Sequence, residues 1–223
     1  MKSSIVALLG LAALSGMSQA AVVVLIDATT RNGSFDSPTL AASIKSGFDA
    51  PASDIVNWTN TNISWAGTAG TYGDTGVDLN AGGAHTGNQF AFFKGSAGGA
   101  FNLTNYAIQS GDQFSLSWYG RADTIGVRLF SSTDASYATA VTLAQISQAQ
   151  PGGYAQYSLS YTAVPADAGK TIGVSVFNSA IGYANVDDFV LTVTQVPEPS
   201  SCLSLAVGGA ALVLRRSRRT RLS

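Results

Sequence analysis

Cysteine and histidine are almost missing from this chain. Its 223 residues hold one cysteine, Cys202, and one histidine, His85. A lone cysteine excludes a disulfide within the chain. His85 is the only candidate base and lies in a Gly-rich loop with no cysteine near it, so the sequence gives little support for a nucleophile triad and contains no His/Cys metal cluster. We therefore predict that the protein is not an enzyme and that His85 lies exposed on the surface.

Charged residues are also scarce, and the two signs are unevenly distributed. Residues 21–196 contain six lysines and arginines against twelve aspartates, a net charge of −6, and they contain no glutamate. Five arginines crowd into the last nine residues. Because the body of the chain has no basic patch, we exclude nucleic acid as a partner.

The first twenty residues have the layout of a secretion signal. Lys2 supplies a positive charge, residues 5–14 are apolar, and the segment ends Ser18-Gln19-Ala20. About ten apolar residues are too few to span a bilayer, and this order is typical of a signal peptide. We predict a signal peptide over 1–20, cut after Ala20 or, with a slip of one residue, after Ala21. An N-terminal core helix is the alternative.

Three features follow one another at the C-terminus. A helix-incompatible segment, Pro197-Glu198-Pro199, comes first. An apolar run of about thirteen residues follows, which as a helix would be about 20 Å long against a hydrocarbon core of about 30 Å. The predicted anchor residues in this run are Cys202, Leu203, Leu205, Val207, Leu212, Val213 and Leu214. The residues predicted to stop translocation are Arg215, Arg216, Arg218 and Arg219.

This order of Pro-Glu-Pro, short apolar helix and arginine cluster resembles the PEP-CTERM sorting signal over residues 196–223. The positive-inside rule keeps the arginines in the cytoplasm, with the preceding domain outside. The resemblance implies that an exosortase-type enzyme cuts the tail near the motif. We expect a precursor anchored in the inner membrane that passes to the cell surface or extracellular matrix. A permanent single-span anchor is the alternative.

The sequence pattern predicts one all-β domain over residues 21–195. Apolar and polar residues alternate with period two between Gly, Asn, Asp and Pro, and no stretch has a convincing helical period. In Gln113–Tyr119, for example, Phe114 and Trp118 fall on one face and Ser115 on the other. The clearest strands are 22–26, 89–93, 113–119, 126–130, 154–161, 171–177 and 185–193, and residues 59–88 are expected to form loops. Such strands favour an antiparallel β-sandwich.

Four short motifs in this domain resemble the galactose-binding-like jelly roll of carbohydrate-binding modules. They are Asn32-Gly33-Ser34-Phe35-Asp36, Trp58, the segment 110–118, and Ala184-Asn185-Val186-Asp187-Asp188-Phe189-Val190-Leu191. The resemblance implies that the first and last strands meet. It also implies a structural Ca²⁺ held by Asp36 with Asp187 or Asp188, since calcium prefers oxygen ligands. The alternative is that these aspartates cap turns.

Aromatic rings and hydrogen-bonding side chains point to a glycan-binding surface. The candidates are Trp65, Tyr72, Tyr119 and Arg121, whereas Trp58 and Trp118 are expected in the core. A glycosidase needs two positioned carboxylates. Asp187 and Asp188 occupy adjacent strand positions, so we expect them to face opposite ways. We predict an exported surface or matrix protein that binds extracellular polysaccharide; the alternatives are a structural matrix protein without ligand and a secreted polysaccharide-degrading enzyme.

Overall fold

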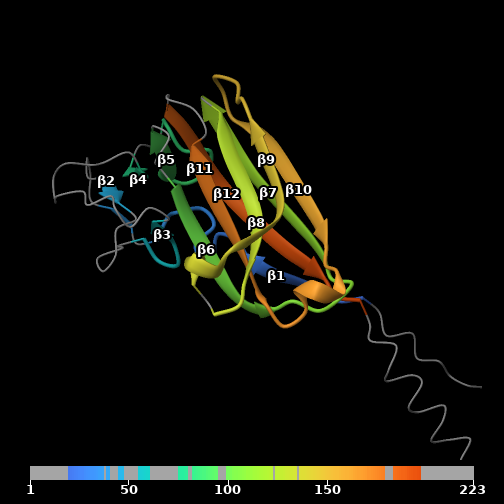
Figure 1. Ribbon diagram of the computed structural model, residues 1–223. Helices are drawn as coiled ribbons and strands as arrows, with labels where there is room; N and C mark the ends of the chain where they lie inside the picture. Colours follow the sequence, from blue (N-terminus) through green and yellow to red (C-terminus); the bar gives the residue numbers. More distant parts are fainter. Residues whose placement is uncertain are drawn as a thin grey trace, which may run out of the picture. The chain divides into compact units, whose positions relative to one another are not determined.

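A computed structural model describes residues 20–37, 39–40, 45–47, 55–60, 75–79, 82–94, 99–122, 124–134, 136–178 and 183–196. Ala21–Gln195 form one compact unit, in which two antiparallel sheets pack face to face (Figure 1). Among the described residues, no helix is long and apolar enough to cross a membrane. Except for Ala20 and Val196, the predicted signal peptide and sorting tail lie outside these residues.

The first sheet has seven strands, and β1 pairs with β12 beside its main path. The main path runs in the order β10 (Ala155–Thr162), β7 (Gln113–Ala122), β12 (Tyr183–Thr194), β5 (Gln89–Lys94), β4 (Thr75–Leu79) and β2 (Lys45–Gly47), and β1 spans Val22–Ile26. The second sheet has five strands, in the order β3 (Thr59–Asn60), β6 (Gly99–Ala107), β11 (Thr171–Asn178), β8 (Ile125–Ser132) and β9 (Val141–Gln148). Two short 3-10 helices, η1 (Tyr137–Thr139) and η2 (Pro165–Asp167), complete the described elements.

The all-β antiparallel sandwich is confirmed, and each of the seven predicted strands coincides with an observed one. The prediction of loops over residues 59–88 is wrong in part, because β3 and β4 lie there. The sequence pattern does not predict β6 and β9, and the reason is physical in each case. β6 places polar Asn102 and Thr104 in the buried interior, and β9, at a sheet edge, has no alternating burial.

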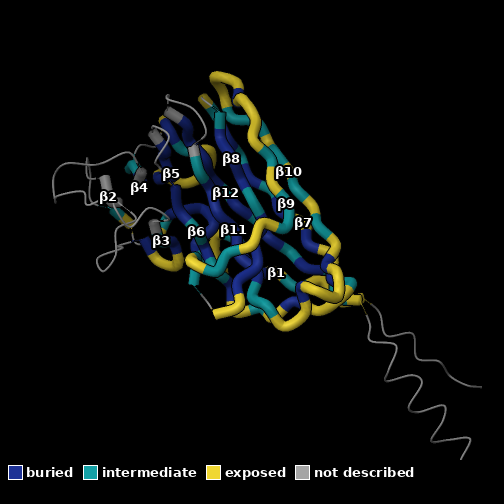
Figure 2. The backbone as a smooth tube through the Cα atoms, viewed as in Figure 1, coloured by how far each residue is buried: buried dark blue, intermediate teal, exposed yellow. Residues whose placement is uncertain are grey.

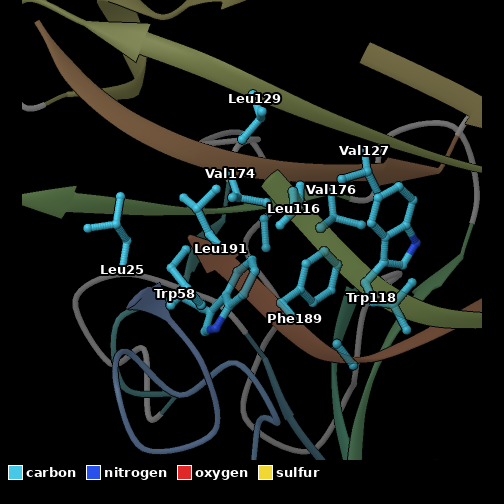
Figure 3. Close-up of a cluster of buried hydrophobic side chains, with 14 of the residues drawn as sticks. Leu25, Trp58, Leu116, Trp118, Val127, Leu129, Val174, Val176, Phe189 and Leu191 are labelled. Carbon is cyan, nitrogen blue, oxygen red and sulfur yellow. The ribbon is translucent and has the colours of Figure 1, made fainter. Parts of the chain in front are cut away.

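Buried aromatic rings fill the space between the sheets (Figure 3). Trp118 on β7 stacks on Phe189 of β12 with ring centroids 6.0 Å apart, and Trp58 contacts the same ring at 5.5 Å. Phe35 in turn packs on Trp58 at 4.8 Å. Both tryptophans are only 1% exposed, so the prediction that Trp58 and Trp118 belong to the core is confirmed.

The segment that follows β1 is hydrogen-bonded to the last strand, β12. The Gly33 carbonyl accepts a hydrogen bond from the Phe189 amide at 2.9 Å, and the Trp58 indole donates to the Asn32 carbonyl at 2.9 Å. A Cβ at Gly33 would lie 2.2 Å from the Phe189 carbonyl oxygen, so only glycine fits. With β1 paired to β12, the expectation that the first and last strands meet is confirmed.

Candidate binding site

One face of the seven-stranded sheet turns away from the core, and we call it the outer face. On β7 the alternation sends Phe114, Leu116 and Trp118 inward. The side chains directly opposite one another in antiparallel strands share a face, so the pairing of β7 with its neighbours defines the outer face. It comprises Gln113, Ser115, Ser117, Tyr119 and Arg121 of β7, Gln156, Ser158, Ser160 and Thr162 of β10, Asn185, Asp187, Val190, Thr192 and Thr194 of β12, and Val22 and Val24 of β1.

The middle of this outer face is polar but uncharged. Between Gln113 and Tyr119 it presents hydroxyl and amide side chains across β10, β7 and β12, with valines at the side of β1. Six residue steps along a strand correspond to about 20 Å. At the Gln113 end lies a groove of about 450 Å³, lined by Gln113, Phe114, Ser115, Ser160, Tyr161, Thr162 and Thr194. Hydroxyls and amides can both donate and accept hydrogen bonds, so this track suits a ligand rich in hydroxyl groups.

At the other end of the track, residues 82–88 fold over Tyr119. The His85 ring stacks on the Tyr119 ring with centroids 3.6 Å apart and an interplanar angle of 14°. Tyr154 meets the edge of His85 at 5.3 Å and donates its hydroxyl hydrogen to the Gly83 carbonyl at 2.9 Å. His85 is exposed, as predicted, but its ring also closes one side of Tyr119. The aromatic end of the track is therefore a step made of two stacked rings.

Arg121 lies next to this step. Its guanidinium carbon sits 5.0 Å from the Tyr154 ring centroid and 5.7 Å from that of Phe90. With the Asn185 amide oxygen turned toward it, Arg121 donates two hydrogen bonds of 3.0 and 3.1 Å. These contacts hold a positive charge at the aromatic end of the outer face, with its planar group fixed against aromatic rings.

The prediction that Asp187 and Asp188 face opposite ways is wrong. The pairing of β12 with β7 shifts between Asp187 and Val190, and Asp188 has a φ of 51°. A bulge of this kind interrupts the period of two, and both carboxylates reach residues 85 and 86. Asp187 Oδ2 accepts the backbone N–H groups of His85 (2.9 Å) and Thr86 (3.3 Å), while Asp188 contacts His85 Nδ1 and the Thr86 hydroxyl, both at 2.6 Å.

The two carboxylates differ in their surroundings. Asp187 is fully buried, whereas the Asp188 side chain is 18% exposed. Removal from water, followed by the nearby charge of Asp188, raises the pKa of Asp187 to about 8, although the backbone N–H groups of His85, Asp188 and Thr86 act in the opposite direction. The buried Asp187 therefore holds its proton to a higher pH than an exposed aspartate does.

Asp36, the third predicted calcium ligand, lies against the same segment. A Cβ on Gly87, whose φ is +62°, would lie 2.6 and 2.7 Å from the Asp36 carboxylate oxygens. The three aspartates thus surround residues 85–87. A calcium ion would compete with the N–H and O–H donors that already engage Asp187 and Asp188. Across the described part of the chain, no three His, Cys, Asp or Glu side chains gather closely enough to hold a metal ion, so calcium stays a prediction.

Of the four predicted glycan contacts, the structure brings Tyr119 and Arg121 together at one end of the outer face. Trp65 and Tyr72 lie outside the described residues. Sequence reasoning missed His85 as a neighbour of Tyr119 and Tyr154 as a neighbour of His85 and Arg121, because these residues come together from distant segments. The alternating serines of β7 and β10 carried a signal for the hydroxyl track, since the wet face of a strand pattern can be read directly.

No family model matches the chain, and no curated protein matches it. Among solved structures, the Stig cyclase Fisc from Fischerella sp. TAU, in complex with (3Z)-3-(1-methyl-2-pyrrolidinylidene)-3H-indole, aligns with a TM-score of 0.60 and 14% identity over 79% of this chain and 100% of that chain. The CBM22-2 xylan-binding domain from Paenibacillus barcinonensis Xyn10C aligns with a TM-score of 0.45 and 14% identity over 68% of this chain and 99% of that chain.

The chain is thus a two-sheet antiparallel β-sandwich whose fold is similar to that of the Stig cyclases. At these identities the similarity concerns the fold alone.

Proposed function

We propose that the protein is an exported surface or matrix component that binds extracellular polysaccharide along the outer face of its seven-stranded sheet. The observation that carries this proposal is the combination on one face of an uncharged hydroxyl and amide track, a groove and an aromatic step. Rings contact the apolar faces of sugars, and hydroxyls and amides pair with sugar hydroxyls. The predicted signal peptide and PEP-CTERM-like tail would carry the domain out of the cell, where such a polysaccharide is found.

The charge pattern narrows the ligand to a neutral polysaccharide. Between Gln113 and Ser117 the track carries no charged side chain, and Asp187, which pairs with Tyr119, is fully buried. Residues 21–196 have a net charge of −6. An acidic polysaccharide would meet this net negative charge without a basic strip to offset it. A neutral polysaccharide lying along about 20 Å of strand is not repelled by the net negative charge and needs no basic strip to bind.

Binding to immobilised polysaccharides tests this function. The purified protein should be retained by at least one neutral polysaccharide, and Tyr119→Ala should weaken binding by about tenfold, the worth of one good aromatic contact. Tyr137→Ala is the matched control, because Tyr137 stacks on Phe101 of the other sheet at 4.9 Å. Cooperative thermal unfolding well above the assay temperature would show that both variants fold. Binding that Tyr119→Ala leaves intact would refute the placement, and no retention on any polysaccharide would refute the function.

A second candidate function is acid–base hydrolysis of the same polysaccharide. The observation that favours it is the buried Asp187 with a raised pKa beside Asp188 and His85, a pattern found at catalytic sites. We rank it lower because Asp187 is fully buried and already accepts the N–H groups of residues 85 and 86. Release of reducing ends from a bound polysaccharide would favour hydrolysis, and binding without release would favour the non-enzymatic function.

A further inference from the structure

The strand β10 forms an edge of the seven-stranded sheet that lacks the usual protection. It pairs with β7 on one side, and no described strand pairs with its other side. An open edge offers unpaired backbone N–H and C=O groups, and native proteins usually blunt it with Lys, Pro, bulges or a very short strand. β10 has eight residues in unbroken register with β7, and it contains neither a charge nor a proline.

The chain around β10 is uncharged over a long stretch. Residues 135–166 contain no Asp, Glu, Lys, Arg or His, although residues 21–196 as a whole carry a net charge of −6. This stretch also includes β9, the edge strand of the five-stranded sheet, and β9 and β10 lie side by side (Figure 1). Both layers therefore end at an uncharged edge, where two negatively charged copies can approach with the least repulsion.

Apolar side chains are left open to solvent on the same stretch. Val141 at the start of β9 is 53% exposed, and Val164 just after β10 is 48% exposed. Tyr157, Leu159 and Tyr161 pack on the core but are only partly buried. Along β10 the exposure alternates, with exposed positions between half-buried ones (Figure 2). A partner strand beside β10 would cover the solvent-exposed parts of Tyr157, Leu159 and Tyr161.

We infer that β10 pairs antiparallel with β10 of a second copy and joins two seven-stranded sheets into one. The strand is self-complementary about Leu159: Leu159 faces Leu159, Ser158 faces Ser160, and Tyr157 faces Tyr161. Antiparallel pairing of one segment with itself gives a two-fold axis, the commonest symmetry of protein dimers. The remaining pair within the strand joins Gln156 to Thr162, so every cross-strand contact in this register is apolar, aromatic, hydroxyl or amide and none is between charges.

The dimer would also extend the outer face. Residues directly opposite in an antiparallel pair share a face, so the exposed serines of both copies would lie on one surface. Ser160 and Thr162 line the groove and lie on the edge strand, which places the two grooves on either side of the junction. Two linked sites hold a repetitive ligand more tightly than one. The pairing itself does not depend on polysaccharide binding, so each can fail without the other.

Sedimentation of the purified protein at several concentrations tests the pairing. We expect the wild-type protein at twice the monomer mass. In Ser158→Lys/Ser160→Lys each new lysine faces a lysine of the other copy, which should weaken association by about tenfold or more. Asn105→Lys/Thr133→Lys is the charge-matched control, because both residues are exposed and lie outside β10. This control should remain dimeric.

A charge-swap experiment gives a second readout. Ser158→Glu/Ser160→Glu should also be monomeric, and mixing it with the lysine variant should restore a dimer, because each lysine then faces a glutamate. A cooperative unfolding transition and an unchanged circular dichroism spectrum would show that all variants fold, since loss of the dimer itself lowers the melting temperature. A wild-type protein that stays monomeric at every concentration, a lysine variant that keeps the dimer mass, or a mixture that fails to associate would each overturn the inference.

Discussion

Single residues fix the junction between the chain after β1 and the last strand. Gly33 is the clearest case, because a Cβ there would meet the Phe189 carbonyl at 2.2 Å. Gly153 provides a contrast, since a Cβ there would meet nothing within 4 Å. A comparison of the two positions therefore distinguishes a glycine that is required for packing from one that is not.

We expect Gly33→Ala to lower the free energy of unfolding by about 1–3 kcal/mol or more, the usual cost of overpacking. Gly153→Ala should be neutral or slightly stabilising, because alanine restricts the unfolded chain. Denaturant unfolding of both variants measures this difference. Equal stabilities would show that the close approach of Gly33 to β12 does not hold.

The acid pair gives stability a pH dependence whose sign can be stated. Folding raises the pKa of Asp187 from 3.8 to about 8, so between these values the folded state binds a proton that the unfolded state has lost. Stability therefore falls as pH rises from about 4 to about 8. Asp188→Asn removes the neighbouring charge and should flatten this fall, measured as melting temperature against pH in buffer with a chelator. An unchanged slope in the variant would contradict the role of Asp188.

At the scale of elements, the sequence predicts strands with a clean inward and outward alternation, such as β7 and β11. It does not predict β6, whose interior face includes Asn102, or β9, whose position at an edge removes the alternation. The sequence also does not predict the bulge at Asp187 and Asp188, because nothing in the local alternation of β12 indicates a positive φ at Asp188. The hydroxyl track could be read from β7, whereas the approach of His85 required the fold.

The segment 82–88 is the element on which calcium binding would act. The predicted ligands, Asp36 with Asp187 or Asp188, lie around residues 85–87, although the three carboxylates do not gather closely enough in the described structure to hold an ion together. A bound calcium ion would tie this segment to β12. We expect calcium to release heat on titration and to raise the melting temperature, with magnesium as the control ion. No heat and no rise in melting temperature would contradict the predicted calcium site.

At the scale of the whole molecule, destination depends on the two ends of the chain. We expect the protein recovered from cells and medium to have lost residues 1–20 and to end near Pro197-Glu198-Pro199. Intact-mass spectrometry measures both cuts at once. A protein that keeps its terminal arginines in the membrane fraction would favour the permanent anchor. The same protein free in the cytosol would contradict export.

Binding along the outer face is the central claim for the folded domain. Amide hydrogen exchange, measured with and without a soluble oligosaccharide of the retained neutral polysaccharide, tests it most directly. We predict slowed exchange confined to β7, β10, β12 and residues 82–88, with β6, β8 and β11 unchanged. Protection on the five-stranded sheet, or no protection at saturating oligosaccharide, would contradict it.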